Sequence, residues 1–198
     1  MPDLSAWLET PPGQYLLEWE RAVLERMVAD IFGYRAVQIG LPGLDLLAAN
    51  RMPFRFVCAR TGPAAVLANE FELPFASASI DLVLMPHVLE FSADPHQVLR
   101  EVERVLVPEG SVVLSGLNPI SLWGLRRLAA RKDGVPPWRG QYRPAMRIKD
   151  WLKLLGFGPS DLCDDILAEC AGFEPAPLEV ETTEGDLCVL LYTGGTTG

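Results

Sequence analysis

The chain has 198 residues, 49% of them hydrophobic and 22% charged, and a formal net charge of −9. This balance is typical of a globular domain with a core of its own, and it excludes an intrinsically disordered chain. No apolar run approaches the roughly 18 residues that cross a bilayer, and the first residues lack the basic and apolar regions of a signal peptide. We therefore expect a cytoplasmic protein without membrane contact.

The negative charge is concentrated in one part of the sequence. Residues 158–198 contain 9 of the 26 acidic residues and no Lys or Arg. This change predicts a boundary near Gly158, between a domain at 1–157 and an acidic tail at 158–198. The cysteines show neither the CxxC nor the Cys/His spacing of a metal site, so we expect reduced thiols and no metal. They are Cys58, Cys163, Cys170 and Cys188.

Short elements alternate along the first half of the chain. Apolar residues at spacings near three and four predict a helix within residues 5–30. We expect it to begin near Gln14, because Pro11 and Pro12 interrupt the pattern. A strand at Ala36–Ile39 ends at Gly40. A brief helical turn and two more strands are expected at Leu44–Ala49, Phe54–Ala59 and Ala64–Ala68.

The second half contains a strand–helix–strand unit. Apolar runs at Asp81–Met85 and Val112–Ser115 flank a helix that Asp94 caps and whose first turn suits Pro95. The segment Pro108-Glu-Gly110 is expected to end this helix. One helix face collects the apolar side chains Val98, Val102, Val105 and Leu106. Two further helices are expected at Ser121–Ala130 and Lys149–Leu155.

A strand–helix–strand unit of this length predicts parallel pairing with a right-handed crossover. We therefore expect an α/β fold: an open, mostly parallel, doubly wound, Rossmann-like sheet with helices on both faces. The predicted strand order is 3-2-1-4-5, with Asp81–Met85 in the centre.

Residues 68–116 also carry a resemblance to a known family. The segments LPFASASIDLV, HVLEF and LREVERVLVPEGSVVLSG occur in this order. Together they resemble the second half of a class I, S-adenosylmethionine-dependent methyltransferase. The resemblance implies S-adenosylmethionine as cofactor and a methyl acceptor that is a small molecule or another, unidentified substrate.

The glycine loop after the first strand departs from that family. The family pattern is acidic-x-G-x-G-x-G, and here Gly40 matches, whereas Pro42 and Leu44 replace the later glycines and Gln38 replaces the acidic residue. At the end of the second strand, Ala59 and Arg60 stand where the family has a carboxylate for the ribose hydroxyls. The first half of the fold is thus degenerate. A tight turn that binds no ligand remains an alternative interpretation of the loop.

The resemblance assigns roles to particular residues. The cofactor-binding candidates are Gly40, Leu41, Gly43, Asn69, Glu70 and Met85. His87 follows the fourth strand and is the candidate general base, because an imidazole titrates near neutral pH; the alternative is a residue that starts a helical turn. Asn118 and Trp123 are the substrate-binding candidates, with a helix cap and a core position as their alternatives.

Two further resemblances concern the rest of the chain. NPxSLWGLRR at Asn118–Arg127 is similar to a proteobacterial group of type 11-like methyltransferases, and extends the resemblance over 1–157. Residues 119–153 hold nine basic and two acidic residues. We interpret them as a solvated face, with nucleic-acid binding left open. The tail at Gly185–Gly198 resembles a truncated phosphate loop of adenylate-forming, acyl-CoA synthetase-like enzymes.

Three hypotheses follow from these patterns. The first is S-adenosylmethionine-dependent methyl transfer to an unidentified acceptor. The second is a non-catalytic methyltransferase-like binding module, and the third is a truncated chimera with a fragment of an adenylate-forming enzyme. We expect residues 158–198 to pack loosely, with Leu187–Tyr192 at most adding a strand at the sheet edge. A hairpin of Leu178–Glu181 with Leu187–Thr193 is the alternative.

Overall fold

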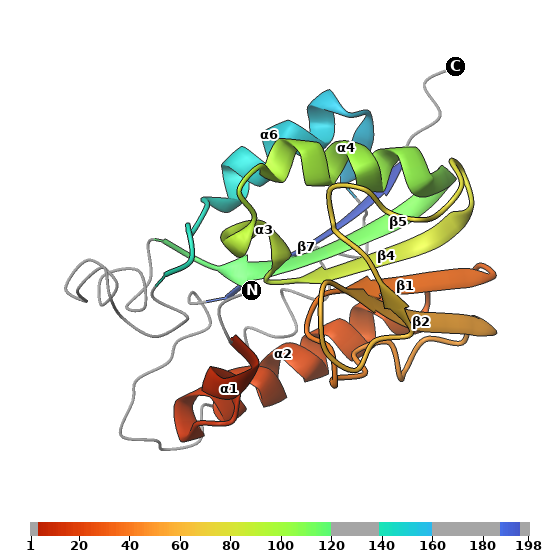
Figure 1. Ribbon diagram of the computed structural model, residues 1–198. Helices are drawn as coiled ribbons and strands as arrows, with labels where there is room; N and C mark the ends of the chain where they lie inside the picture. The colour runs from red at the N-terminus through yellow and green to blue at the C-terminus, as the bar shows by residue number, and fades with distance from the viewer. Residues whose placement is uncertain (1–3, 120–138, 160–186, 195–198) are drawn as a thin grey trace.

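A computed structural model describes residues 4–119, 139–159 and 187–194 of the chain. These residues form one sheet in the order β3-β2-β1-β4-β5-β7-β6, with helices on both faces (Figure 1). The strands are β1 Arg35–Ile39, β2 Phe54–Ala59, β3 Val66–Leu67, β4 Ile80–Pro86, β5 Leu106–Leu117, β6 Phe157–Pro159 and β7 Leu187–Gly194. The helices are α1 Leu4–Leu8, α2 Pro11–Ala29, α3 Val88–Phe91, α4 Pro95–Val105 and α6 Ala145–Leu154.

The first five strands confirm the predicted fold class and strand order. β1 pairs in parallel with β2 and with β4, β2 pairs with β3, and β4 pairs with β5. β4 occupies the middle of the sheet, as expected for a strand that is buried on both faces. The carboxyl ends of these parallel strands therefore lie at the same end of the sheet, where ligands bind in doubly wound folds.

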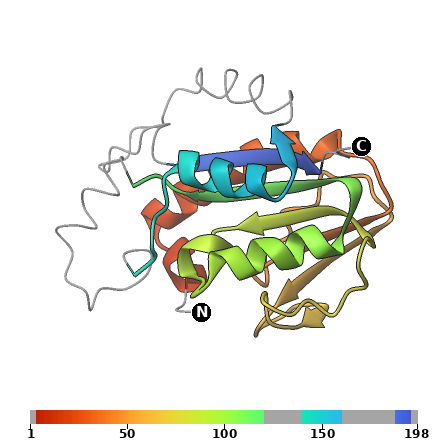
Figure 2. The same ribbon diagram turned by 90° about the horizontal axis from the view of Figure 1, so that it is seen from above.

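The two faces of the sheet have separate apolar cores. Leu82 and Leu84 of β4 pack in the core that includes α1 and α2. Val83 and Met85, which point to the opposite face, pack in the core that includes α4 and α6. Figures 1 and 2 show α1 and α2 on one side of the sheet and α3, α4 and α6 on the other.

The predicted helix after Asp94 is confirmed, but its end is not. The Asp94 side chain accepts hydrogen bonds from the backbone N–H groups of His96 and Gln97, both at 3.1 Å. The helix ends at Val105, and Leu106 already belongs to β5. The expected stop at Pro108-Glu-Gly110 is therefore wrong, because pairing with β4 begins at Leu106.

The predicted start of the N-terminal helix near Gln14 is also wrong. α2 begins at Pro11, where Thr10 caps the helix and a proline needs no backbone N–H. Gly13 allows α1 to approach closely, since a Cβ on Gly13 would lie 2.2 Å from the Trp7 carbonyl oxygen. Pro-Pro-Gly therefore starts this helix and does not interrupt it.

Other boundaries differ more simply. The helical turn expected at Leu44–Ala49 is wrong, because this segment is irregular, with one bend and one turn but no helix. The third strand spans only Val66–Leu67. α6 begins at Ala145, earlier than Lys149, and ends before Gly156, whose φ is +84°. The expected helix at Ser121–Ala130 lies outside the described residues.

The strand β7 is not at the sheet edge. It pairs antiparallel with β5 from Ser111 to Leu117 on one side and with β6 on the other. The expectation of an edge strand is therefore wrong, since β6 holds the edge. The segment Leu178–Glu181 lies outside the described residues, and the division near Gly158 stays a prediction. None of the described helices is long and apolar enough to cross a membrane.

Candidate functional site

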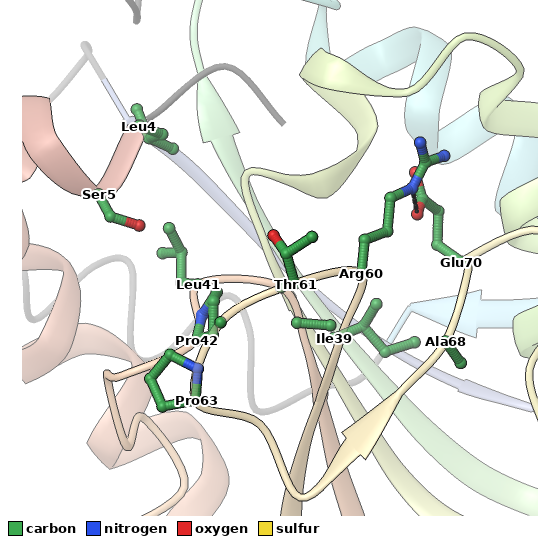
Figure 3. Close-up of a pocket in the computed structure, with 13 residues that line it drawn as sticks. Leu4, Ser5, Ile39, Leu41, Pro42, Arg60, Thr61, Pro63, Ala68 and Glu70 are labelled. Carbon is green, nitrogen blue, oxygen red and sulfur yellow. Dashed lines mark hydrogen bonds and ion pairs between the residues drawn. The ribbon is translucent and has the colours of Figure 1, made fainter.

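A cavity of about 270 Å³ lies at the carboxyl ends of β1, β2 and β3 (Figure 3). In a doubly wound fold, ligands are expected at this end of the sheet. Figure 3 shows Leu4 and Ser5 of α1 across the cavity from Arg60 and Glu70. The lining residues are Leu4, Ser5, Ile39, Gly40, Leu41, Pro42, Ala59, Arg60, Thr61, Gly62, Pro63, Ala68 and Glu70.

Two loops with left-handed backbone form one wall of the cavity. Gly40 and Gly43 have φ near +90°, and Leu41 between them has φ +45°, which is strained for a branched side chain. The second loop follows β2, and a Cβ on its Gly62 would lie 2.9 Å from Cγ of Pro42. The loops therefore pack against each other, and the lack of a side chain at Gly62 allows this contact.

Gln38, at the position of the family's acidic residue, holds the glycine loop from inside. Its side chain is completely buried, and Nε2 donates hydrogen bonds to the carbonyl oxygens of Gly40 and Leu44 at 3.1 and 2.9 Å. A third carbonyl, that of Leu41, lies 3.3 Å from Nε2. Oε1 accepts from the Leu46 N–H at 3.0 Å. A carboxylate cannot donate to these carbonyls, so this loop conformation requires the amide.

This arrangement determines which backbone donors the loop offers. In a planar trans peptide the C=O and the following N–H point in opposite directions. Because the Gly40 carbonyl points at Gln38, the Leu41 N–H points away from Gln38. The next peptide, whose carbonyl belongs to Leu41, has no N–H because residue 42 is proline. The loop therefore has one donor fewer than a loop with glycine at position 42.

Arg60, at the start of the loop after β2, forms an ion pair with Glu70 at the side of the cavity across from Leu4 and Ser5 (Figure 3). Arg60 Nε and Nη2 lie 2.5 and 2.8 Å from the two carboxylate oxygens of Glu70, a bidentate geometry. Nη2 also lies 3.1 Å from Oδ1 of Asn69, and the guanidinium stands 5.3 Å from the centre of the Phe71 ring. Glu70 is 4% exposed, so Arg60 holds a nearly buried carboxylate in a fixed position.

A second polar group lies at the carboxyl ends of β4 and β5. It comprises Glu20 of α2, His87, Glu90 of α3 and Ser115 of β5, which we call the buried cluster. His87 is 1% exposed, and its Nε2 and Nδ1 lie 3.2 Å from Glu20 Oε2 and 3.1 Å from Glu90 Oε2. The Ser115 hydroxyl donates to the other oxygen of Glu20, and the Leu117 N–H donates to the other oxygen of Glu90.

The two carboxylates determine the charge of the imidazole. Burial lowers the pKa of His87, but Glu20 and Glu90 raise it, and the resulting pKa lies well above the ordinary value. Burial raises the pKa of Glu20, but His87 and Ser115 lower it below its ordinary value. His87 is thus an imidazolium with both nitrogens bonded to carboxylates. In this arrangement neither nitrogen is free to take a proton from a substrate.

The structure separates the predicted site residues. Gly40, Leu41 and Glu70 line the cavity. Gly43 lies in the same loop but is exposed, and Asn69 binds Arg60. The remaining candidates lie elsewhere: Met85 is buried in the core, His87 is in the buried cluster, Asn118 directly follows β5, and Trp123 lies outside the described residues. The roles assigned to all these residues stay predictions.

Sequence reasoning missed much of the cavity wall. Arg60 stood out only as a departure from the family, whereas Thr61, Gly62 and Pro63 after β2 and Leu4 and Ser5 of α1 gave no family signal. The Gly-Pro pair at the end of a strand was the available signal for a tight loop there. Among the residues that the structure describes, no group of His, Cys, Asp and Glu is arranged to hold a metal ion.

Comparison with known proteins shows which fold family this architecture resembles. Residues 43–114 match the family model of the methyltransferase domain. A methyltransferase from Thermotoga maritima that depends on S-adenosylmethionine has the same fold, with a TM-score of 0.65 over 91% of this chain and 97% of its own. This chain has the fold of a class I methyltransferase. A second such enzyme, from Aquifex aeolicus, gives a TM-score of 0.60 with 98% of each chain covered. The two structures share 17% and 12% sequence identity with this chain.

Curated relatives of this methyltransferase-fold chain are more similar in sequence. The uncharacterized protein YafS of Escherichia coli is 44% identical over 153 residues, which cover 76% of this chain and 64% of YafS. A malonyl-[acyl-carrier protein] O-methyltransferase of Methylovorus is 38% identical over 93 residues, 47% of this chain and 31% of that enzyme. The chain thus spans less than two thirds of the length of these relatives.

Proposed function

We propose that the chain binds S-adenosylmethionine in the cavity and transfers its methyl group to an acceptor that is not yet identified. One observation carries the proposal: the cavity lies at the carboxyl ends of β1, β2 and β3, against the left-handed loop at Gly40–Gly43, in a methyltransferase fold. The match of residues 43–114 to the methyltransferase domain supports it. For the acceptor we favour a small molecule, with nucleic acid as the less favoured alternative.

The residues of the cavity fit this cofactor in part. Its volume of about 270 Å³ is close to the lower end of the roughly 300–1,000 Å³ typical of small-molecule sites. Ile39, Leu41 and Ala68 offer apolar surface for a flat base. Glu70 offers carboxylate oxygens that accept hydrogen bonds from sugar hydroxyls, as acidic side chains do in related doubly wound folds. The missing N–H at Pro42 predicts weak binding.

The bound cofactor would supply an electrophilic methyl group on a sulfonium. The contribution of the chain is then to hold the cofactor and the acceptor in line and to exclude water, which accounts for most of the rate in reactions of this kind. A general base is not essential when the acceptor is already nucleophilic. The engagement of both His87 nitrogens is therefore compatible with the proposal.

Calorimetric titration with S-adenosylmethionine and S-adenosylhomocysteine tests the proposal directly. We expect saturable binding of both, and no binding at millimolar ligand would refute the proposal. Substitution Glu70→Gln should weaken binding of adenosine by about 10-fold or more, because a hydrogen bond to a charged group contributes about 1.5–3 kcal/mol. Binding of 2′,3′-dideoxyadenosine should change little. Glu72→Gln is the matched control, because Glu72 is exposed and does not line the cavity.

A second candidate function is a binding module that does not transfer a methyl group. Gln38 and Pro42 favour it, because both depart from the family pattern, Pro42 in the loop that lines the cavity and Gln38 in the strand that holds this loop. The [4+2]-cyclase SpnF also shares this fold, with a TM-score of 0.56. Its name describes an activity other than methyl transfer, so the fold alone does not imply methyl transfer. Mass spectrometry of methyl transfer to a panel of acceptors, starting with a malonyl thioester, separates the two functions.

The finer resemblances are proposals too. The group with NPxSLWGLRR depends mainly on residues 120–127, which lie outside the described residues. For the tail, the pairing of β7 with β5 and β6 supports an integral strand of the sheet in preference to a foreign fragment. We therefore expect no binding of ATP. Measurable ATP affinity that is lost when residues 185–198 are removed would support the adenylate-forming resemblance instead.

A further inference from the structure

The buried cluster joins parts of the chain that are far apart in sequence. His87 Nε2 contacts Glu20, which is 67 residues earlier on α2, and Nδ1 contacts Glu90 on α3. The His87 N–H donates to the Ser115 carbonyl of β5 at 3.0 Å, and the Glu90 carbonyl accepts from the Gln141 N–H at 2.7 Å. α2 lies outside the segment that matches the methyltransferase domain, which begins at residue 43.

The hydrogen bonds of the cluster are complete only when the imidazole carries two protons. A carboxylate oxygen accepts hydrogen bonds but does not donate them, and each ring nitrogen faces one such oxygen. The remaining oxygens of Glu20 and Glu90 accept from Ser115 and from the Leu117 N–H. Glu20 and Glu90 are the two titratable groups of the described residues that raise the pKa of His87. Loss of one carboxylate would therefore remove half of the charge that holds the ring.

The same turn packs behind Gly40, which lines the cavity. His87 has φ +54°, a left-handed conformation that a residue with a Cβ rarely adopts, at the junction between β4 and α3. Next to it, Val88 stands behind Gly40: a Cβ on Gly40 would lie 3.1 Å from Val88 Cγ2 and 3.8 Å from the Pro86 carbonyl oxygen. The position of residues 86–88 therefore sets the position of the first glycine of the loop.

We propose that His87 is a positioning residue whose imidazolium, held between Glu20 and Glu90, fixes the turn at residues 86–88 against Gly40. Through Glu20, the N-terminal helix α2 becomes a structural part of the ligand site. The proposal rests on the proposed function for its consequence on cofactor affinity. The structural part of the proposal, which is the contact between the turn and Gly40, is independent of the proposed function.

Nuclear magnetic resonance tests the structural content. Long-range ¹H–¹⁵N correlation spectra show whether each ring nitrogen carries a proton, and we expect both nitrogens of His87 to be protonated from pH 6.5 to 8.5. In Glu20→Ala the backbone amide signals of Gly40 and Leu41 should shift. A neutral His87 ring in the unchanged protein at pH 7, or unchanged Gly40 and Leu41 signals in Glu20→Ala, would overturn the proposal.

Affinity for S-adenosylmethionine tests the consequence. We expect Glu20→Ala to weaken binding by about 10-fold, a difference of about 1.4 kcal/mol. Glu20→Gln keeps a hydrogen-bonding group without the charge, and it replaces the alanine variant in this test if the alanine variant does not fold. It should bind as the unchanged protein does at pH 6.5 and at least about 5-fold more weakly at pH 8.5, as the ring loses its proton. Affinity that depends on neither substitution nor pH would refute the role of the charge.

Matched controls and the readout by resonance keep the two proposals distinguishable. Glu18→Ala lies on an exposed position of α2, and His96→Gln changes the exposed histidine of α4. Both should leave the Gly40 signal and the affinity unchanged. If the unchanged protein binds no S-adenosylmethionine, the proposed function fails, whereas the shift of the Gly40 signal still decides whether His87 positions the loop.

Discussion

Replacing Gln38 by glutamate restores the acidic residue of the family and should destabilise this protein. If the introduced carboxyl group is ionised, the Gly40 and Leu44 carbonyls lose their buried donor. Each lost hydrogen bond lowers the free energy of unfolding by about 1–3 kcal/mol. If the introduced carboxyl group stays protonated at pH 7, a shift of about 2.7 units from its ordinary pKa near 4.3 costs about 3.7 kcal/mol. Both routes give about 4 kcal/mol, which lowers the Tm of a domain of this size by about 8–16 °C.

Urea denaturation followed by circular dichroism measures this effect at several pH values. The pKa of the introduced carboxyl group should be higher in the folded than in the unfolded state, so the stability deficit is small below about pH 4 and grows as pH rises above the unfolded pKa. Gln14→Glu is the control, because Gln14 is exposed on the first turn of α2. A free energy of unfolding for Gln38→Glu within about 0.5 kcal/mol of the unchanged protein at pH 7 would refute the reasoning.

Four further predictions follow from the same structure. Pro42→Gly supplies a backbone N–H to the loop and should tighten S-adenosylmethionine binding about 5-fold in calorimetry, from about 1 kcal/mol for one hydrogen bond; unchanged or lost affinity would contradict this role of the loop. Gly62→Ala should lower the free energy of unfolding by about 1–3 kcal/mol in urea, because φ is +90° and the new Cβ would lie 2.9 Å from Pro42 Cγ; an effect under about 0.5 kcal/mol would argue against the packing of the two loops. Burial, and secondarily Glu70, raises the pKa of the Cys58 thiol to about 11, so mass spectrometry should find Cys58 alkylated at pH 8 only after unfolding; rapid alkylation of the native protein would contradict its burial. Deletion of residues 187–198 removes the ladders of β7 with β5 and β6 and should lower the Tm by more than about 10 °C, and a shift under about 2 °C would show that β7 does not stabilise the sheet.

The second half of the sheet could be predicted from the sequence because its signals are local. α4 has a capping Asp94, a proline at its first position and a face of buried apolar residues, and all three point to the same helix. The flanking strands are apolar runs long enough to be recognised. The parallel pairing and the strand order then follow from the crossover rule, which leaves few topologies.

The first half could not be predicted as well because tertiary contacts determine it. Pro11 and Pro12 look like helix breakers in sequence, and only the cap by Thr10 and the packing of Gly13 on Trp7 show that a helix starts there. The turns after Leu44 are fixed by the Gln38 side chain, which no helical or strand periodicity reports. Local propensity is a weak guide where a buried side chain organises a loop.

The candidate site shows the same limit. The sequence can place Gly40, Leu41 and Glu70 at the cavity because the family pattern assigns the ends of strands to the ligand, whereas their roles stay predictions. The partner of His87 was not found, because Glu20 is 67 residues away and looks like any other acidic residue on α2. Burial of a polar side chain between elements cannot be read from one sequence, and here it places both nitrogens of the candidate base against carboxylates.

The place of β7 between β5 and β6 has a consequence for synthesis of the protein. During translation, the long strand β5 emerges well before residues 187–194, so one of its edges stays unpaired for the time that the ribosome needs to reach β7. At about 5–20 residues per second, this interval lasts several seconds. A twelve-residue strand that carries Val112, Val113 and Leu114 is then an open template for other nascent chains. We expect chaperones that shield strand edges to increase the yield of soluble protein.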